Sequence, residues 1–339
     1  MNTKRHYIDL NPLINHPTAL VACAWTDKGD GKTTALICAA WDSVMSCGKI
    51  ATIARRVSSE MGKSWRSDVL LKLKRFRKTP DDLEWTGDEK HGFQLVDGAG
   101  KVYFFAAPLT RLAKLKSAMD YETHKNLYID EYVILSGSYL PREVATILDI
   151  YKTIDRNHWE SRILVCGNRI GKPPPLDLFF NADVNYNKNG LTTYQNGRYA
   201  VLIYSNKHNA ALDRLSPFGE LVEGTEFESY NSGGMLYEYT PPIYLGKLKR
   251  PVFALLNGKD VCTVFYTDTC AVCLVRGIFG AVQCYSVTPE TATKSAPWFK
   301  KFDGVRQFLS NHAAKGDIFY RSKREAAQLE NIAKYIYRA

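Results

Sequence analysis

One stretch near the N-terminus has the residue types and spacing of a phosphate-binding loop. It is made of Thr26, Asp27, Lys28, Gly29, Asp30, Gly31, Lys32 and Thr33. In the general pattern, G-x-x-x-x-G-K-[ST], backbone N–H groups surround phosphate oxygens, the lysine reaches the β- and γ-phosphates, and the last hydroxyl ligates Mg²⁺. An apolar run over residues 19–25 precedes the loop, and a helical pattern from Thr33 and Thr34 follows it. The stretch therefore predicts a nucleotide site, although Thr26 stands where the pattern has its first glycine.

A second element supplies the carboxylates that such a site needs. Residues 125–131 read as a short apolar strand that ends in Asp130 and Glu131. In P-loop ATPases an aspartate at this place helps to hold Mg²⁺, and the adjacent glutamate polarises the attacking water. Open α/β sheets bind ligands outside the carboxyl ends of their strands, which suits both roles. A solvated turn after a strand is the alternative for this pair. Together with the loop, the pair predicts an ATPase that uses ATP and Mg²⁺.

Length and composition place the chain among ordinary globular proteins. It has 339 residues, of which 45% are hydrophobic, and this is enough for two domains with packed cores. No apolar run has the length needed to span a bilayer. Residues 1–6 lack the apolar core of a secretion signal. We therefore expect a protein of the cytosol that has no membrane partner.

The net charge of +10 is unevenly distributed. Residues 55–78 hold nine lysines and arginines against two acidic residues, a local charge of +7, and residues 300–339 hold nine against four. Such blocks suggest contact with a polyanion, and the backbone of a nucleic acid is the obvious candidate. A solvated basic helix face is the alternative for residues 55–78.

Four of the eight cysteines lie close together in the sequence, at positions Cys262, Cys270, Cys273 and Cys284. Four thiols could ligate zinc, but one C-x-x-C pair is present where zinc ribbons use two. Cys262 and Cys273 also fit alternating strands. We therefore expect reduced cysteines buried in a sheet rather than a metal site.

Apolar, strand-like runs alternate with helical patterns up to about residue 205. The expected strands lie near residues 19–25, 50–54, 102–105, 127–130 and 162–166, and the expected helices near 33–46, 58–78, 109–118 and 141–155. Continuous apolar strands that alternate with helices indicate a mainly parallel sheet covered on both faces. Residues 1–205 are therefore expected to form an α/β P-loop domain.

The composition changes after residue 205. Residues 206–242 are rich in glycine, proline and asparagine, as turns and linkers are. From residue 243, short β-type runs with hairpin signals follow, and a helix closes the chain. We therefore expect a linker over residues 206–242 and a second, β-rich α+β domain over residues 243–339.

Several strings of the sequence together resemble one family. They are Tyr128-Ile129-Asp130-Glu131, Tyr139-Leu140-Pro141-Arg142-Glu143-Val144, Asp155-Arg156-Asn157, Cys166-Gly167-Asn168, Leu178-Phe179-Phe180-Asn181 and a block over residues 218–227. With them, the chain resembles the DNA-packaging ATPases, or encapsidation proteins, of phi29-like bacteriophages, which are compact relatives of the terminase large subunits. The resemblance covers most of the chain. It implies a P-loop NTPase fold of the ASCE, terminase type for the first domain.

The resemblance assigns roles to the loop and to the acidic pair. Lys32 and Thr33 would serve phosphate and Mg²⁺, and Asp130 would assist the metal. Glu131 would be the catalytic carboxylate. These roles agree with the chemistry, because phosphoryl transfer depends on positioning and on charge compensation as the γ-phosphate leaves.

The resemblance also implies basic and amide residues around the nucleotide. Arg156 matches the arginine finger that the family delivers across a ring interface to a neighbour's γ-phosphate, with pairing to Glu160 as the alternative. Lys116 resembles a second basic residue that acts in trans, and an ordinary solvated lysine is its alternative. Lys28 stands where the family has a basic residue inside the loop. Asn168 falls where terminases couple hydrolysis to movement, and it could otherwise cap a turn.

The loop departs from the family pattern in ways that bear on affinity. Thr26 replaces the first glycine, so this corner must adopt a conformation that a β-branched residue tolerates. Asp27 and Asp30 add negative charge beside the phosphates. We expect Lys28 and Lys32 to offset it, with modest nucleotide affinity outside an assembled ring.

For the second domain the resemblance implies a nuclease-like fold. Terminase large subunits carry an RNase H-like nuclease that uses several carboxylates around metal ions. The aspartates of this part of the chain are Asp260, Asp268, Asp303 and Asp317, and none forms a pair on adjacent strand ends. Because the phi29-like relatives lack the nuclease active site, we expect a vestigial RNase H-like domain without nuclease activity. It would dock onto the capsid assembly, or onto a structural packaging RNA where one exists.

As a whole, the resemblance implies an ATP-driven motor that translocates double-stranded viral DNA through a portal into a preformed capsid. The motor would be a homomeric ring, which the family makes a pentamer, in the host cell cytoplasm and transiently at the portal vertex of the prohead. The alternatives are a P-loop helicase or DNA pump of another system, a nuclease, and a non-catalytic nucleic-acid-binding scaffold with a decayed loop.

Overall fold

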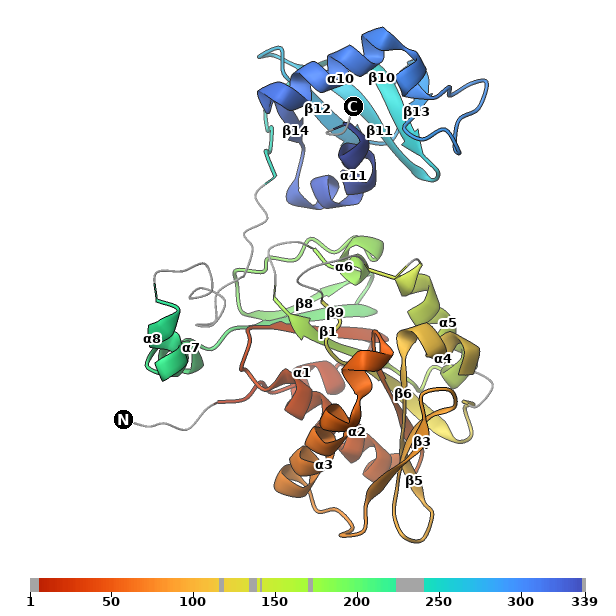
Figure 1. Cartoon of the computed structure of the whole chain (residues 1–339), viewed down its shortest axis with the longest axis vertical. Helices are drawn as coiled ribbons and strands as arrows, with labels where there is room; N and C mark the ends of the chain where they lie inside the picture. The colour runs from red at the N-terminus through yellow and green to blue at the C-terminus, as the bar shows by residue number, and fades with distance from the viewer. Residues whose placement is uncertain are drawn as a thin grey trace. The chain divides into compact units, whose positions relative to one another are not determined.

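The computed structural model describes residues 6–115, 119–133, 139–140, 142–169, 173–223 and 241–336. The chain divides into two compact units, Met1–Tyr237 and Glu238–Ala339 (Figure 1). The first part of the expected linker forms two short helices, α7 (Lys207–Arg214) and α8 (Pro217–Leu221), which belong to the first unit. Residues 224–240 of that linker lie outside the described residues. The boundaries at residues 205 and 243 stay a prediction.

A mixed sheet forms the centre of the first unit. Within the described residues it has nine strands in the order β3-β4-β5-β2-β6-β7-β1-β9-β8. Their bounds are β1 (Val21–Thr26), β2 (Ile50–Arg55), β3 (Glu84–Asp88), β4 (Gly92–Val96), β5 (Val102–Pro108), β6 (His124–Ile129), β7 (Ile163–Asn168), β8 (Gly190–Tyr194) and β9 (Tyr199–Tyr204). The strands from β5 to β9 in that order run parallel, and antiparallel neighbours close both edges.

Five of these strands lie where the sequence predicts strands, and the other four, β3, β4, β8 and β9, were not predicted. The hairpin β3–β4 was not predicted, because β3 has the sequence Glu-Trp-Thr-Gly-Asp and is half-exposed or exposed along its length. β8 is likewise exposed at nearly every position. β9 is buried along almost its whole length, and its sequence Tyr-Ala-Val-Leu-Ile-Tyr is a continuous apolar run. That run was the signal available to find it.

Helices cover both faces of the sheet. The chain adds α1 (Asn11–Ile14), α2 (Lys32–Cys47), η1 (Ser58–Met61), α3 (Lys63–Phe76), α4 (Leu109–Leu115), α5 (Glu143–Asp155) and α6 (Pro175–Phe179). Alternate residues of β1 separate two hydrophobic clusters: Ala22 and Ala24 pack with α1, α2 and α3, whereas Val21 and Cys23 pack with α4, α5 and α6. Helices thus cover both faces of the parallel sheet, as continuous apolar strands require.

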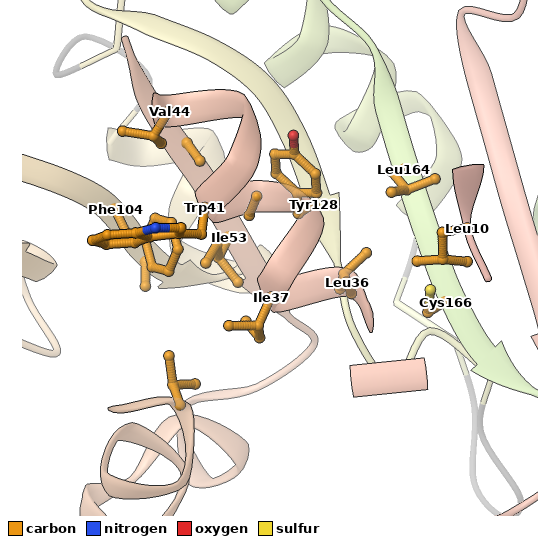
Figure 2. Packing of buried hydrophobic residues seen from close by; sticks show 14 of the residues in the cluster. Leu10, Leu36, Ile37, Trp41, Val44, Ile53, Phe104, Tyr128, Leu164 and Cys166 are labelled. Atoms are coloured by element: carbon orange, nitrogen blue, oxygen red, sulfur yellow. The ribbon is translucent and has the colours of Figure 1, made fainter. Parts of the chain in front are cut away.

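α2 is the helix that fixes the phosphate loop to the sheet. Figure 2 shows its buried residues against the strands, with Trp41 next to Ile53 and Phe104. The ring of Trp41 stacks on Tyr103 at 4.9 Å and meets Phe104 edge-on at 6.1 Å. Each such buried side chain contributes about 1.5–3 kcal/mol. The start of α2 is therefore held rigidly with respect to the strand ends.

A buried carboxylate lies on the other face of β1. Asp177 of α6 is fully buried and accepts hydrogen bonds from Trp25 Nε1 at 3.0 Å and from the hydroxyls of Tyr186 and Tyr199. Burial raises the pKa of Asp177 to about 6, and the three donors counteract that rise. Because Trp25 directly precedes the loop, this cluster ties α6 to the base of the candidate site.

The second unit has its own sheet and core. In its described part the strand order is β13-β10-β11-β12-β14. Its elements are β10 (Leu248–Asn257), β11 (Asp260–Thr267), β12 (Val272–Arg276), β13 (Cys284–Ser286), η3 (Phe299–Lys301), α10 (Asp303–Lys315), β14 (Ile318–Tyr320) and α11 (Lys323–Ile336). Leu309 of α10 and Leu329 and Ile332 of α11 pack on one face of the sheet. An RNase H-like fold for this unit stays a prediction.

The carboxylates and cysteines of the second unit are dispersed. Asp268 accepts a hydrogen bond from the Tyr244 hydroxyl, and Asp317 lies 2.8 Å from Nδ1 of His312. Cys262 and Cys273 are buried in β11 and β12, and Cys270 is exposed. Among the residues that the structure describes, no three His, Cys, Asp or Glu side chains are grouped so that they could hold a metal ion. Nor does any described helix have the length and apolarity needed to cross a membrane.

The buried Asp177 predicts a specific dependence of stability on pH. Its pKa is raised from 3.8 to about 6, so between these values the native state binds more protons than the unfolded state and stability falls as the pH rises. A shift of this size corresponds to about 3 kcal/mol. We expect the unfolding free energy of Asp177→Asn, relative to the unsubstituted protein, to rise by about that amount between pH 4 and pH 7. Urea denaturation at both pH values measures it.

The control is Asp183→Asn, because Asp183 is exposed on the same segment. That variant should follow the pH dependence of the unsubstituted protein. If Asp177→Asn follows it as well, the buried carboxylate does not titrate as the structure indicates.

Candidate nucleotide-binding site

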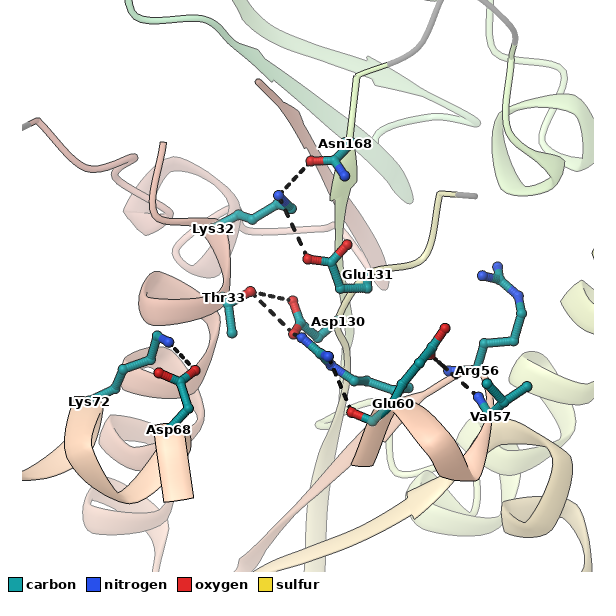
Figure 3. Close-up of polar contacts among 11 residues, drawn as sticks. Lys32, Thr33, Arg56, Val57, Glu60, Asp68, Lys72, Asp130, Glu131 and Asn168 are labelled. Carbon is teal, nitrogen blue, oxygen red and sulfur yellow. Dashed lines mark hydrogen bonds and ion pairs between the residues drawn. The ribbon is translucent and has the colours of Figure 1, made fainter. Parts of the chain in front are cut away.

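Three strand ends meet at one edge of the first sheet. β7 pairs in parallel with β1 on one side and with β6 on the other. The residues that follow β1 and β6, and Asn168 at the end of β7, therefore lie together (Figure 3). The register sets Thr26 opposite Asn168. The phosphate loop, the acidic pair and Asn168 are predicted to lie at this edge, and the structure brings them together there.

The phosphate loop (residues 26–33) turns into α2 through two glycines in the left-handed region. Gly29 has φ 86° and Gly31 has φ 78°, and Gly31 is the N-cap of α2. A Cβ atom on Gly31 would lie 2.1 Å from Cδ1 of Tyr7. Both the backbone angle and the close approach of Tyr7 thus require glycine here. The loop presents the N-terminus of α2, where backbone N–H groups and the helix dipole favour an anion.

Thr26 occupies the position of the missing glycine without backbone strain. It is the last residue of β1, is buried, and is not among the described residues with positive φ. Its hydroxyl donates a hydrogen bond to the carbonyl of Asp27 at 3.0 Å. Because this corner is extended strand rather than a left-handed turn, a β-branched residue is well accommodated.

Asp27 forms a salt bridge with Arg169, a residue that belongs to no sequence motif. Arg169, the residue after Asn168, donates from Nε and Nη2 to the two Asp27 oxygens at 2.8 and 3.1 Å. The Asp27 side chain is buried, and that of Arg169 is 9% exposed. Arg169 also donates from its backbone N–H to Thr26 and from Nη1 to the carbonyl of Tyr186, each at 2.7 Å. Burial raises the pKa of Asp27, and Arg169 opposes that rise.

Asp30 is held on the opposite side of the loop. It is buried and accepts a hydrogen bond from Nδ2 of Asn209 at 2.9 Å. Asn209 also bonds the backbone of His6 in both directions, at 3.0 and 2.6 Å. Burial raises the pKa of Asp30 to about 6. Arg169 and Asn209 therefore bind the two loop acids directly, and the charge of Lys32 also lowers the pKa of both. Lys28 lies exposed.

The expected catalytic side chains contact one another. Lys32 Nζ donates to Asn168 Oδ1 at 2.6 Å and lies 3.9 Å from Glu131 Oε1. Thr33 Oγ1 donates to the Asp130 carboxylate, with distances of 3.0 and 3.2 Å to its oxygens. Figure 3 shows these contacts converging from α2, β6 and β7. The Thr33 hydroxyl and the Asp130 carboxylate are oxygen donors of the kind that Mg²⁺ prefers, so the residues present fit this ion.

Glu131 is held in a strained backbone conformation. Its φ is 54°, a region that costs a non-glycine residue of order 1–3 kcal/mol and often marks a functional site. Its neighbours are anchored on both sides, since the N–H of Asp130 donates to Ala54 at 2.9 Å and that of Tyr132 to Cys166 at 3.0 Å. The Glu131 side chain is about one-third exposed, at 34%. The carboxylate is thus fixed where a ligand can reach it.

Arg55 at the end of β2 is a further site residue that the sequence analysis did not single out. It donates from Nε and Nη2 to Asp130 Oδ2 at 3.0 and 2.5 Å. The adjacent Arg56 forms a buried pair with Glu143 at 2.9 Å and donates to the carbonyl of Tyr132. Two of the charges in the basic block 55–78 are therefore used inside the protein. That block had been expected to contact a polyanion.

Arg156 lies away from the site of its own chain. It is the C-cap of α5, which begins at Glu143 beside Arg56 and spans thirteen residues, a length of about 20 Å. Asp155 accepts backbone hydrogen bonds from residues 159–161, at the amino end of β7. Glu160, the alternative partner of Arg156, instead lies 3.7 Å from Lys125. Lys116 lies outside the described residues.

The Asp27–Arg169 pair gives a prediction for the loop. In Arg169→Gln a buried carboxylate loses its counter-ion beside the phosphate positions, which should lower the unfolding free energy by about 3–5 kcal/mol and weaken nucleotide binding. Asp27→Asn/Arg169→Gln removes both charges, so the pair should recover part of both losses. Urea denaturation and calorimetric titration with ATP–Mg²⁺ measure the cycle. Strictly additive losses would contradict a coupled pair.

Comparison with known proteins places the chain in a family. Residues 7–235 match the family model described as Podovirus DNA encapsidation protein (Gp16). The DNA packaging proteins of Bacillus phages PZA and phi29 are each 28% identical over 133 residues, 38% of this chain and 38% of each relative. The sequence match thus spans well under half of the length of these relatives.

Solved structures resemble the fold of the whole chain. The structure titled "The bacteriophage Phi-29 viral genome packaging motor assembly" is similar with a TM-score of 0.73 at 18% identity, covering 98% of both chains. "The Phi-28 gp11 DNA packaging Motor" is similar with a TM-score of 0.63 at 14% identity and the same coverage. At these identities the likeness concerns the fold. Because the family model covers more than half of the sequence, the chain belongs to the podovirus DNA encapsidation protein (Gp16) family.

Proposed function

We propose that this chain is the ATP-hydrolysing subunit of a motor that moves double-stranded viral DNA through a portal into a preformed capsid. Family membership supports the packaging role. The observation that carries the ATPase assignment is the convergence of Lys32, Thr33, Asp130, Glu131 and Asn168 on one edge of the sheet. A decayed, non-catalytic loop would not need a strained carboxylate fixed 3.9 Å from Lys32.

In this proposal each side chain acts from its observed position. Lys32 exchanges its contact with Asn168 for the β- and γ-phosphates, while the N–H groups of the loop bind phosphate oxygens. Glu131 orients the attacking water and accepts its proton. Asn168, released by Lys32, is free to contact the γ-phosphate. Thr33 and Asp130 are the residues that would hold Mg²⁺, which would compensate phosphate charge there.

The site is completed by a second subunit. Arg156 lies at the far end of α5 from the site of its own chain, so it could reach a γ-phosphate across an interface, as an arginine finger does. A head-to-tail interface of this kind forms a homomeric ring where its rotation closes, and we infer a pentamer. The second unit would dock onto the portal or capsid, or onto a structural RNA. The motor would work in the host cell cytoplasm at the portal vertex.

DNA would be gripped mainly through its phosphates. The net charge of +10 supports this kind of contact, which is independent of sequence and weakens as salt rises. Since Arg55 and Arg56 are already engaged in ion pairs, the gripping residues would lie elsewhere in the chain.

Two substitutions test the catalytic assignment. Lys32→Ala should abolish both ATP–Mg²⁺ binding and hydrolysis, because the phosphates lose their lysine. Glu131→Gln should keep binding and lose about 10²–10⁴ in turnover, the range of general-base catalysis. Calorimetry and ATPase assays with and without double-stranded DNA separate the two. The control is Glu84→Gln, an exposed position on β3; normal turnover in both test variants would refute the assignment.

Mixing variants tests whether Arg156 acts in trans. Arg156→Ala should reduce turnover by about 10³–10⁵, as the loss of an arginine finger does. When Arg156→Ala and Lys32→Ala subunits are mixed, some neighbouring pairs combine an intact loop with an intact arginine. ATPase activity should therefore return in the mixture, although neither variant is active alone. Failure to recover activity in mixed rings that demonstrably assemble would place the action of Arg156 within its own chain.

A further inference from the structure

A stacked pair of rings joins two segments at the amino ends of β6 and β7. The centroids of the Tyr121 and His158 rings lie 3.5 Å apart, and the ring planes are inclined by 9°. Tyr121 belongs to the turn before β6, and His158 to the loop between α5 and β7. Because β6 and β7 are parallel neighbours, both segments lie at the edge of the sheet opposite to the candidate nucleotide site. The pair therefore lies away from the nucleotide site of its own chain.

The Tyr121 ring is fixed by its own surroundings. Lys49 Nζ donates to the backbone carbonyl of Tyr121 at 2.7 Å and lies 3.7 Å from the centroid of its ring. A hydrogen bond to Glu160 raises the pKa of the Tyr121 hydroxyl. The carboxylate of Asp120 closes the turn by accepting hydrogen bonds from the N–H and the hydroxyl of Thr123, at 2.8 and 2.7 Å. Tyr121 thus offers a fixed, flat surface to the loop beside it.

The loop that carries Arg156 is held in two places. The buried carboxylate of Asp155 accepts backbone hydrogen bonds from residues 159–161 at 2.8–3.0 Å, which fixes the second half of the loop. In the first half, Arg156 has φ 45° and the next residue has φ 65°. This backbone region is costly for residues other than glycine, so contacts within the folded chain must select it. The stack of His158 on Tyr121 is such a contact, two residues beyond Arg156.

The loop presents its side chains to solvent. Arg156 is exposed, and the exposed fraction of Trp159 in the same loop is 66%. An arginine that acts on the phosphate of another subunit must be placed accurately, because a misplacement of about 1 Å can cost about 100-fold in rate. A loop that is ordered before association also loses little conformational entropy when the subunits meet. A side-chain stack beside Arg156 meets both requirements.

We propose that Tyr121 and His158 are positioning residues, whose stacked rings orient Arg156 for action on the nucleotide of a neighbouring copy of this chain. The proposal rests on the function proposed above, in which Arg156 acts in trans. It adds to that function a contact within the subunit that donates the arginine. The two rings act through the backbone of residues 156–158 and not by touching the nucleotide.

Substitutions that remove or keep the flat rings test the stack. His158→Ala and Tyr121→Leu lose the stacked pair, whereas His158→Phe and Tyr121→Phe keep a flat ring at each position. His91→Ala is the matched control, because His91 is an exposed histidine in the turn between β3 and β4. For each full-length variant, ATPase assays with double-stranded DNA give kcat and KM, and calorimetry gives the Kd for ATP–Mg²⁺. Thermal melting confirms that each variant is folded.

His158→Ala and Tyr121→Leu should lower kcat about 10- to 100-fold, the cost of a misplaced catalytic group, and leave the Kd for ATP–Mg²⁺ unchanged. His158→Phe and Tyr121→Phe should restore most of the lost turnover, because a flat ring again stacks. His91→Ala should behave as the unsubstituted protein does. A normal kcat in both variants that lose the stack overturns the proposal, and so does an equal loss of kcat in His158→Phe and His158→Ala.

Mixed rings show in which subunit the stack acts. A mixture of His158→Ala and Lys32→Ala subunits should exceed the mean activity of the two variants, because a Lys32→Ala subunit donates an ordered arginine loop to an intact phosphate loop. A mixture of His158→Ala and Arg156→Ala subunits should not exceed that mean, because both substitutions affect the donated loop. The opposite pattern would place the effect of His158 in its own nucleotide site and overturn the proposal.

The mixture of Arg156→Ala with Lys32→Ala separates this proposal from the function on which it rests. Recovery in that mixture, without recovery when His158→Ala replaces Arg156→Ala, overturns the role of the stack alone. Absence of recovery with Arg156→Ala, in rings that contain both variants, overturns the action of Arg156 in trans, and the positioning role falls with it.

Discussion

The parallel pairing of β7 between β1 and β6 is the constraint on which the candidate site depends. It brings the carboxyl ends of three strands to one edge of the sheet, so the loop, the acidic pair and Asn168 meet although they are far apart in the sequence. Hydrophobic packing of α2 and α5 on opposite faces holds this register. A one-residue slip would turn every side chain of a strand to the other face. The cost of such a slip in core burial is therefore what keeps Lys32 near Glu131.

Two partners from outside the loop explain how it accommodates acidic residues: Arg169 forms a salt bridge with Asp27, and the neutral amide of Asn209 binds Asp30. A carboxylate inside a phosphate loop would repel its ligand, yet Asp27 points to Arg169 and Asp30 to Asn209. Arg169 follows β7, and Asn209 lies in α7 after β9, so two separate segments of the chain hold the loop. Arg169 adjoins Asn168, which holds Lys32. The end of β7 thus contacts both the first and the last part of the loop.

The sequence was informative where the signal is local. Continuous apolar runs located the central strands, and the loop and acidic pair were found from residue type and spacing. Residues whose role depends on distant pairing were missed: Arg55, Arg169 and Asn209 carry no motif of their own, and Asn209 lay in a stretch whose composition is that of a linker. The hairpin β3–β4 was missed because a polar edge strand has no apolar alternation. Tertiary context, not propensity, decides such positions.

The loop that carries Arg156 has the features of a rigid structure rather than a flexible tether. Arg156, Asn157 and Trp159 all have positive φ, a costly arrangement for residues other than glycine. Asp155 offsets that cost by accepting three backbone hydrogen bonds, and His158 stacks on Tyr121 at 3.5 Å. A preformed loop gives up little conformational entropy on association. If this loop meets a neighbour, the position of Arg156 is therefore set mainly by the relative placement of two subunits, and hydrolysis becomes sensitive to that placement.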